Sequence, residues 1–237
     1  MRARLAFLSP MVLLLAVWSQ LALAMGDDDP LLTMVLIDRL EAGPAEDPVP
    51  QRLEAQAWVG YDVNKLWLKS EVEREGGETE SADLEVLYSR AIAPFWDAQV
   101  GWRHDFKPSP SRDWLAIGFQ GLAPYFFEVD STLYLGGSNR SSFEVSAEYE
   151  LLFTQRLILS PEVELVFNGY NDEETGAGSG LASAEAGLRL RYEIRREFAP
   201  YIGVHWERSY GNTADFVRDE GGSIDDTYFV IGVRAWF

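Results

Sequence analysis

The sequence predicts an all-β protein, an antiparallel transmembrane outer-membrane β-barrel of about 12 strands. Three observations predict this fold. Almost every segment past residue 24 alternates apolar and polar residues with a period of two, the spacing that separates the two faces of a strand. The links between these segments are alternately long and short. The chain also ends on an aromatic residue, Phe237, which falls on the apolar face of the last segment.

The N-terminal segment is predicted to be a cleaved secretory signal peptide, residues 1–24. Two arginines precede an apolar run over residues 5–18, and Ala22-Leu23-Ala24 supplies the small residues of a cleavage site. An N-terminal membrane anchor is the alternative, but the apolar run is short for a membrane span of about 20 residues. We therefore expect an exported protein in which residues 25–237 form one barrel domain.

Each predicted strand carries one apolar and one polar face. In residues 143–153, Phe143 and Val145 project to one side of the strand. Glu144 and Ser146 project to the other side, because successive side chains of a strand point in opposite directions. No convincing helical periodicity follows the signal peptide. The alternation predicts strands, in chain order, over residues 31–40, 53–62, 65–75, 82–91, 94–106, 112–122, 125–135, 143–153, 157–168, 182–194, 200–210 and 227–237.

The links between the strands orient the barrel, because long loops on one rim and short periplasmic turns on the other are typical of transmembrane β-barrels. Long polar links are predicted at residues 41–52, 75–80, 107–111, 136–142, 169–180 and 211–225. Short turns are predicted at residues 62–64, 91–93, 123–124, 154–156 and 197–199. A soluble barrel would turn its apolar faces inward. Export, the unequal rims and the terminal aromatic favour the opposite arrangement, with lipid outside and charge inside.

An Ala-Pro-aromatic phrase occurs three times, in IAPFW, LAPYF and FAPYI. Proline fixes φ and donates no backbone hydrogen bond, so it suits a turn or the first residue of a strand. We expect all three phrases at short turns, with Phe95, Tyr125 and Tyr201 in the aromatic girdle at the membrane surface. Ordinary hairpin corners of a soluble sandwich would explain the prolines but not the unequal rims.

Composition narrows the possible partners. The formal net charge is −18 at pH 7, with 38 Asp and Glu against 20 Lys and Arg. This balance argues against a nucleic-acid partner and favours cations. The chain has no cysteine, so neither disulfides nor thiolate metal sites contribute, and the fold depends on backbone hydrogen bonds and packing.

Several long phrases resemble the copper resistance protein B family. They include WVGYDVNKLWLKSEVER, YSRAIAPFWDAQVGWRHDFKPSPSRDWLAIGFQGLAPYFFEVD and LRLRYEIRREFAPYIGVHWERSYG, and the resemblance spans roughly residues 27–237. It implies an outer-membrane β-barrel associated with copper tolerance in Gram-negative bacteria, with copper as the ion concerned. Typical members carry a Met- and His-rich segment ahead of the barrel. Here only Met25-Gly26 separates Ala24 from Asp27, so we do not expect copper binding by that segment to carry over.

The resemblance implies a non-enzymatic protein of the cell outer membrane that takes part in copper resistance and copper homeostasis. Expected partners are outer-membrane lipid, lipopolysaccharide and copper ions, and a periplasmic copper-binding protein is a further candidate; we expect a monomer. One alternative is a cation-selective porin-like channel without specific copper binding. The other is a lipid hydrolase, for which His104 with Ser109 or Ser111 is the only candidate grouping.

The candidate metal ligands are Glu148, Glu162, Glu164, His205 and Glu207, all on polar faces that point into the predicted lumen. A ring of carboxylates biases permeation toward cations, and imidazole is a good ligand for copper. Two other interpretations remain open. The carboxylates pair with lumen arginines in an internal lattice of salt bridges, or His205 simply forms a hydrogen bond to a carboxylate.

The acidic stretches 171–174 and 219–226 are expected to be solvated loops, because their ligand spacing matches no Ca²⁺ loop; chelation of a divalent cation outside the cell is the alternative. His104 belongs to the lipid-facing set near the rim of long loops, which makes it a poor candidate for a lumen ligand.

Overall fold

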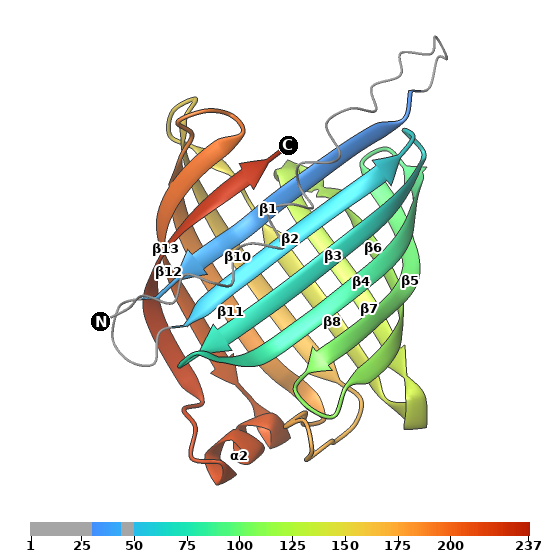
Figure 1. Cartoon of the computed structure of the whole chain (residues 1–237), viewed down its shortest axis with the longest axis vertical. Helices are drawn as coiled ribbons and strands as arrows, with labels where there is room; N and C mark the ends of the chain where they lie inside the picture. The colour runs from blue at the N-terminus through green and yellow to red at the C-terminus, as the bar shows by residue number, and fades with distance from the viewer. Residues whose placement is uncertain (1–29, 44–49) are drawn as a thin grey trace, which may run out of the picture. The chain divides into compact units, whose positions relative to one another are not determined.

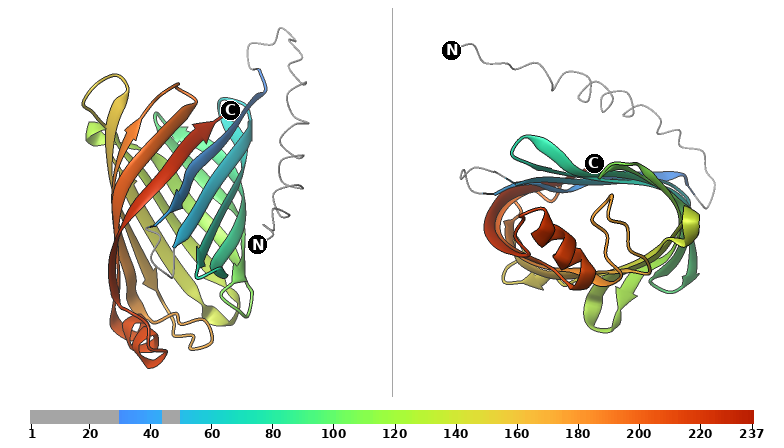
Figure 2. Two further views of the ribbon diagram at one scale, coloured as in Figure 1. Left: turned by 60° about the vertical axis from the view of Figure 1, so that its left-hand side comes forward. Right: turned by 90° about the horizontal axis from the view of Figure 1, so that it is seen from below.

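The structure is a computed structural model, and it describes residues 30–43 and 50–237. The predicted signal peptide, residues 1–24, lies outside the described residues. Figure 1 shows strands that wind side by side around a common axis. Seen along that axis, the barrel has an oval cross-section (Figure 2, right).

Twelve strand positions close the barrel. The strands are β1 (Leu32–Ala42), β2 (Gln51–Gly60), β3 (Asn64–Glu75), β4 (Glu78–Ala93), β5 (Trp96–Lys107), β6 (Arg112–Ala123), β7 (Phe127–Gly136), β8 (Ser141–Glu148), β9 (Leu151–Leu152), β10 (Leu157–Asn168), β11 (Gly180–Tyr192), β12 (Phe198–Ser209) and β13 (Asp225–Trp236). Two short 3-10 helices, η1 (Pro124–Phe126) and η2 (Gly137–Asn139), and one α-helix, α2 (Gly211–Asp219), lie in the links. No helix in residues 30–43 or 50–237 is long and apolar enough to cross a membrane.

Every strand pairs antiparallel with its neighbours, and β13 returns to pair with β1, with Leu36 opposite Trp236. The predicted all-β barrel of 12 strands is therefore confirmed. The first and last strands meet because no water reaches the hydrocarbon core, so every backbone N–H and C=O there needs a partner within the sheet.

β8 and β9 together occupy one strand position, since both pair with β10. The break between them lies opposite Pro161, which has no N–H to donate to the ladder. Only the Pro161 carbonyl takes part there, accepting from the Tyr149 N–H at 3.0 Å.

The two faces of the strands separate as predicted. Leu66, Leu68 and Leu115 are exposed on the outer surface, whereas Glu85 and Arg189 are buried on the inner face. Because the outer surface is apolar and the inner face is charged, the barrel has the inverted arrangement of a membrane protein.

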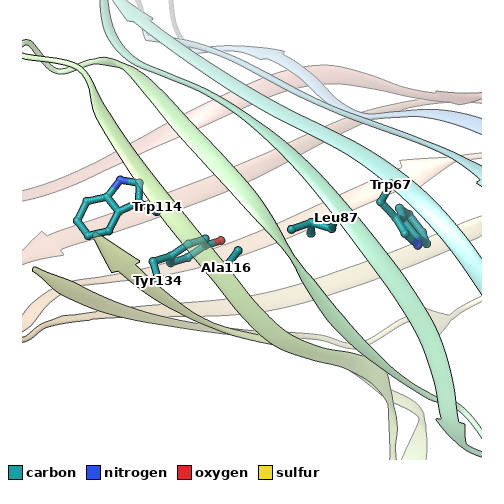
Figure 3. Close-up of a cluster of buried hydrophobic side chains, with 5 residues drawn as sticks. All are labelled: Trp67, Leu87, Trp114, Ala116 and Tyr134. Atoms are coloured by element: carbon teal, nitrogen blue, oxygen red, sulfur yellow. The ribbon is translucent and has the colours of Figure 1, made fainter. Parts of the chain in front are cut away.

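One part of the inner face is aromatic rather than charged. Trp67, Leu87, Trp114, Ala116 and Tyr134 form a buried cluster contributed by strands β3, β4, β6 and β7 (Figure 3). Two of their polar atoms bond lumen carboxylates: the Trp114 indole donates to Asp105 at 2.6 Å and the Tyr134 hydroxyl donates to Glu85 at 2.6 Å. This aromatic wall fills one side of the lumen.

The expected position of the Ala-Pro-aromatic phrases at short turns is confirmed for two phrases and wrong for the third. Phe95 and Tyr125 lie in short turns with φ of 68° and 69°, and their side chains are exposed. The third phrase lies inside β12, where Pro200 is opposite Val233. Alternation along that strand turns Tyr201 inward, where its hydroxyl donates to buried Glu41 at 3.0 Å. Tyr201 is therefore a lumen residue and not part of the girdle.

Two links differ from their predicted form. The link predicted over residues 75–80 is a two-residue turn, Gly76-Gly77, because β3 continues to Glu75 and β4 begins at Glu78. The link over residues 211–225 contains α2, a helix of nine residues that is too short to show a helical period in the sequence.

A buried ion pair next to Tyr201 allows a test of the inner face. Arg189 donates two hydrogen bonds to Glu41, at 2.9 and 3.0 Å, and both side chains are buried. Arg189→Ala is expected to lower the free energy of unfolding by roughly 3–5 kcal/mol, because it leaves a buried carboxylate without a counter-charge. Urea-induced unfolding in lipid vesicles, followed by tryptophan fluorescence, measures this change.

The matched control is Arg196→Ala, which removes an exposed arginine paired with Glu193. It should change the free energy of unfolding by less than about 1 kcal/mol. Equal losses in the two variants would contradict the buried role of Arg189.

Candidate functional site

The lumen contains an acidic cavity of about 420 Å³. Its basic residues are Arg39, Lys69 and Arg103. Its carboxylates are far more numerous: Asp38, Glu54, Glu71, Asp83, Glu85, Glu128, Asp130, Glu144, Glu148, Glu162 and Glu164. The wall of β1–β4 contributes many of these groups. Sequence reasoning did not single out Arg39, Glu54 or Glu71, although the polar sides of their strands carry that signal.

Three of the predicted ligands line this cavity, and they differ in how far they are neutralised. Glu162 pairs with Arg39 and, at 2.9 Å, with Arg189. Glu148 lies directly opposite Glu162 in the sheet and is 3.9 Å from Arg191. Glu164 has no Lys, Arg or His nitrogen within 4.0 Å in the described part of the chain. Of the three, Glu164 is the carboxylate with least protein counter-charge.

The other two predicted ligands, His205 and Glu207, lie on β12 outside the lining of the acidic cavity. They are linked to it by a row of residues that face one another across successive strands, which we call the carboxylate row. Its members are Asp130, Ser146, Glu164, Glu185, Glu207 and Asp226. Like charges opposed across strands are unfavourable without a cation between them.

Arginines reach across the lumen to many of these carboxylates. Arg39 on β1 pairs with Glu162 on β10, and Arg52 on β2 pairs at 2.9 Å with Glu185 on β11. These strands are not neighbours in the sheet, so the ion pairs cross the lumen. A lattice of internal salt bridges is thus present, and it neutralises part of the acidic surface.

The acidic cavity borders an arginine-rich constriction. A second cavity of only about 20 Å³ shares Asp38, Arg39, Glu148 and Glu162 with the first. The additional charged residues that line it are Arg189, Arg191 and Arg234. Since Arg191 and Arg234 lie near the ends of β11 and β13, the constriction is on the side of the short turns.

The link between β10 and β11, residues 169–179, lies with α2 across the other opening of the barrel (Figure 2, right). We call this link the mouth loop. The Gly178 N–H donates to the Thr213 hydroxyl of α2 at 2.9 Å, and the Asn212 amide donates to Asn171 at 3.0 Å. The Tyr170 ring packs against Trp114 of the aromatic wall, with 6.0 Å between the two ring centroids. The mouth loop and α2 therefore form one cap over the lumen.

Asp172 fastens the mouth loop to the far side of the opening. Its buried carboxylate accepts from Arg112 at 2.9 Å and lies 3.1 Å from Arg140. Burial alone would raise the pKa of Asp172, but the hydrogen bond and charge of Arg112, together with Arg140, hold the pKa below its usual value. Within the acidic stretch 171–174, Asp172 is thus held by arginines inside the protein, whereas Glu173 and Glu174 are exposed to solvent.

His104 lies on the outer surface near the same rim, as predicted. Its Nδ1 atom is 2.8 Å from an Asp113 carboxylate oxygen. The centroid of its ring lies 4.5 Å from that of the Phe106 ring and 5.6 Å from that of the Trp102 ring. In the described residues, no three His, Cys, Asp or Glu side chains already form a group that could hold a metal ion.

Comparison with known proteins identifies relatives of this chain. A family model described as copper resistance protein B precursor matches residues 31–237. Copper resistance protein B of Escherichia coli is 45% identical over 204 residues, which cover 86% of this chain and 69% of that protein. The copper resistance protein B homolog of Pseudomonas syringae pv. tomato is 41% identical over 210 residues, which cover 89% of this chain and 71% of that protein.

Two solved porins share the fold. The NanC porin matches with a TM-score of 0.55 and 13% identity, over 86% of this chain and 99% of its own. The KdgM porin matches with a TM-score of 0.50 and 15% identity, over 87% of this chain and 99% of its own. At these identities the likeness establishes an outer-membrane barrel fold and nothing about the transported solute.

The contacts of Asp172 generate a pH prediction. Because its pKa lies below the ordinary value of about 3.9, its ion pairs stabilise the closed mouth loop fully above about pH 4 and are lost as the pH falls further. Asp172→Asn removes the charge at neutral pH. Amide hydrogen exchange in residues 169–179 should then become roughly 10- to 100-fold faster, since hydrogen bonds to charged groups contribute about 1.5–3 kcal/mol.

Glu174→Gln is the control in the same loop, because Glu174 also pairs with Arg112 but is 71% exposed. Its exchange rates should stay close to those of the wild type. If Asp172→Asn leaves the exchange rates unchanged, Asp172 does not fasten the loop.

Proposed function

Since the chain belongs to the copper resistance protein B family, we propose that its acidic lumen and outer loops bind copper ions and pass them through the outer membrane. The family and the barrel fold support a role in copper resistance in the outer membrane. The observation that carries the finer proposal is the excess of carboxylates over basic groups in the lumen cavity. Family and fold also point to a non-enzymatic protein.

The charge of the cavity supports an attraction for cations. A charge-lined space with low-dielectric walls focuses the electric field and raises the local concentration of the opposite charge. Glu128, Glu148 and Glu162 face one another on successive strands, which is unfavourable unless cations lie between them. Arginines neutralise only some of these groups, so the remaining carboxylates favour entry of mobile cations.

In the proposed mechanism, copper exchanges between carboxylates along the lumen. Of the three predicted ligands in the cavity, Glu164 is the most available to a cation, because in the described residues no Lys, Arg or His nitrogen lies within 4.0 Å of it. Glu148 and Glu162 lie between the cavity and the arginine-rich constriction, where the arginines compete with copper for the same oxygens. The constriction limits the nonspecific passage of ions. A cation passes it only by displacing an arginine from the carboxylate with which that arginine is paired.

Carboxylate oxygens bind Cu²⁺ but select it poorly over other dications. The second candidate function is therefore a cation-selective channel without specific copper binding, which the porin-like fold favours. We further propose that the protein is a monomer in contact with lipid and lipopolysaccharide, and that a periplasmic copper-binding protein exchanges metal with it. Copper tolerance and channel selectivity, measured on the same variants, separate the two functions.

The combined variant Glu148→Gln, Glu162→Gln and Glu164→Gln tests the cavity. We expect the cation-to-anion permeability ratio in planar bilayers to fall about tenfold, the low end of the effect of charge-lined clefts. Growth of a deletion strain in copper should be restored by the wild-type gene and not by this variant.

The control removes three carboxylates outside the lumen cavity, by Glu78→Gln, Glu80→Gln and Glu197→Gln, which are exposed at the rims. It should keep both selectivity and copper tolerance. Because Glu162 is paired with arginines, Glu164→Gln alone provides a milder variant that breaks no ion pair. Unchanged selectivity and tolerance in the combined variant would remove the proposal, whereas lost selectivity with full tolerance would favour the simple channel.

A further inference from the structure

His205 is a buried histidine whose ring nitrogens are unpaired. Its side chain is 3% exposed on the inner face of β12, and neither Nδ1 nor Nε2 has a hydrogen-bond partner in the described part of the chain. A buried polar atom left without a partner costs about 1–3 kcal/mol. Such an atom in a native protein calls for an explanation, and a bound water or a bound ion is a usual one.

Two carboxylates face the same nitrogen. His205 Nε2 lies 3.5 Å from a Glu185 oxygen and 3.7 Å from a Glu207 oxygen. Glu185 and Glu207 are directly opposite one another on β11 and β12, and His205 projects from the same face of β12 as Glu207. Both distances are too long for hydrogen bonds to a protonated imidazole, which are normally about 2.7–2.9 Å. Both carboxylates therefore approach the same imidazole nitrogen.

We propose that His205, Glu185 and Glu207 bind a first-row transition-metal dication, with Cu²⁺ preferred. Imidazole with carboxylates is a donor set that suits copper and zinc, and Cu²⁺ binds most tightly in the series. Ca²⁺ and Mg²⁺ prefer all-oxygen surroundings such as the acidic cavity. This site rests on the proposed function for the choice of copper, and it adds the selectivity that carboxylates alone lack.

The surroundings allow the site to close around an ion. Glu207 is 45% exposed, so its side chain is free to move the short distance that brings its oxygen to a metal. Glu185 also accepts from Arg52 at 2.9 Å. The oxygen that accepts from Arg52 is the same oxygen, Oε2, that lies 3.5 Å from His205, so Glu185 keeps Arg52 only if its second oxygen turns toward the ion. The Tyr228 ring, 5.2 Å from the His205 ring, supports the imidazole from the next strand.

The position of the site gives it a route to the cavity. Glu185 lies opposite Glu164, which lines the acidic cavity, and Glu207 lies opposite Asp226 at the start of β13. An ion at His205 therefore lies within the carboxylate row, with Glu164 beyond Glu185 and Asp226 beyond Glu207. The site adjoins the cavity without being part of its lining.

The test uses the full barrel refolded in detergent and titrated with Cu²⁺. The chain has only two histidines, so His205→Gln and His104→Gln form a matched pair. Pulsed EPR of the bound Cu²⁺ reports a coordinated imidazole through modulation from its remote nitrogen. We expect this signal in the wild type and in His104→Gln, and its loss in His205→Gln, with copper affinity on the order of 10- to 100-fold weaker.

Glu207→Gln provides a second variant, because this half-exposed residue can change without loss of the fold. It should weaken copper binding and leave the imidazole signal in place. Circular dichroism confirms the barrel in each variant. An imidazole signal that persists in His205→Gln, a wild type without such a signal, or unchanged affinity in Glu207→Gln would overturn the site.

The combined Glu148→Gln, Glu162→Gln and Glu164→Gln variant separates this proposal from the proposed function. It should retain the imidazole signal even if its copper tolerance and selectivity are lost. Conversely, loss of the imidazole signal in this variant would mean that the histidine site is not separate from the cavity, against the proposal.

Discussion

The barrel depends on one constraint, the pairing of every backbone N–H and C=O within a closed sheet, because hydrocarbon offers these groups no partner. β13 meets the constraint by returning to β1, and the Phe237 N–H donates to the Val35 carbonyl at 2.8 Å. Once the sheet is closed, alternation along each strand places its polar side chains in a single enclosed space. The crowding of charge in the lumen is therefore a consequence of closure as much as of composition.

That crowding is relieved by arginines that act over several strands. A guanidinium has five donors in a planar fork and remains charged when buried, so one group can serve several carboxylates. Arg52 pairs with Glu71, Glu73 and Glu185 in this way. The relief is incomplete because the chain has about half as many basic as acidic residues. The remaining carboxylates leave the lumen cavity with more acidic than basic side chains.

The sequence predicted the strands, the outward apolar face and the inward position of Glu148, Glu162 and Glu164, because these follow from local alternation. Tyr201 was misplaced because the start of β12, rather than the proline motif, decides which face it occupies. The partners of Arg39 and Arg52 could not be predicted, since cross-lumen pairs depend on the closed register of strands far apart in the chain. The unpaired nitrogens of His205 emerge only when all its neighbours are in place.

The proline on β10 has a mechanical consequence. A closed barrel is stiff because each strand is held on both sides, and Pro161 omits one rung of that ladder where β8 gives way to β9. The seam is therefore locally more compliant than an unbroken pair. Glu148 and Glu162 flank it directly. The carboxylates that would have to shift as an ion arrives are thus carried by a part of the wall that yields at low elastic cost, while the rest of the cylinder keeps its shape.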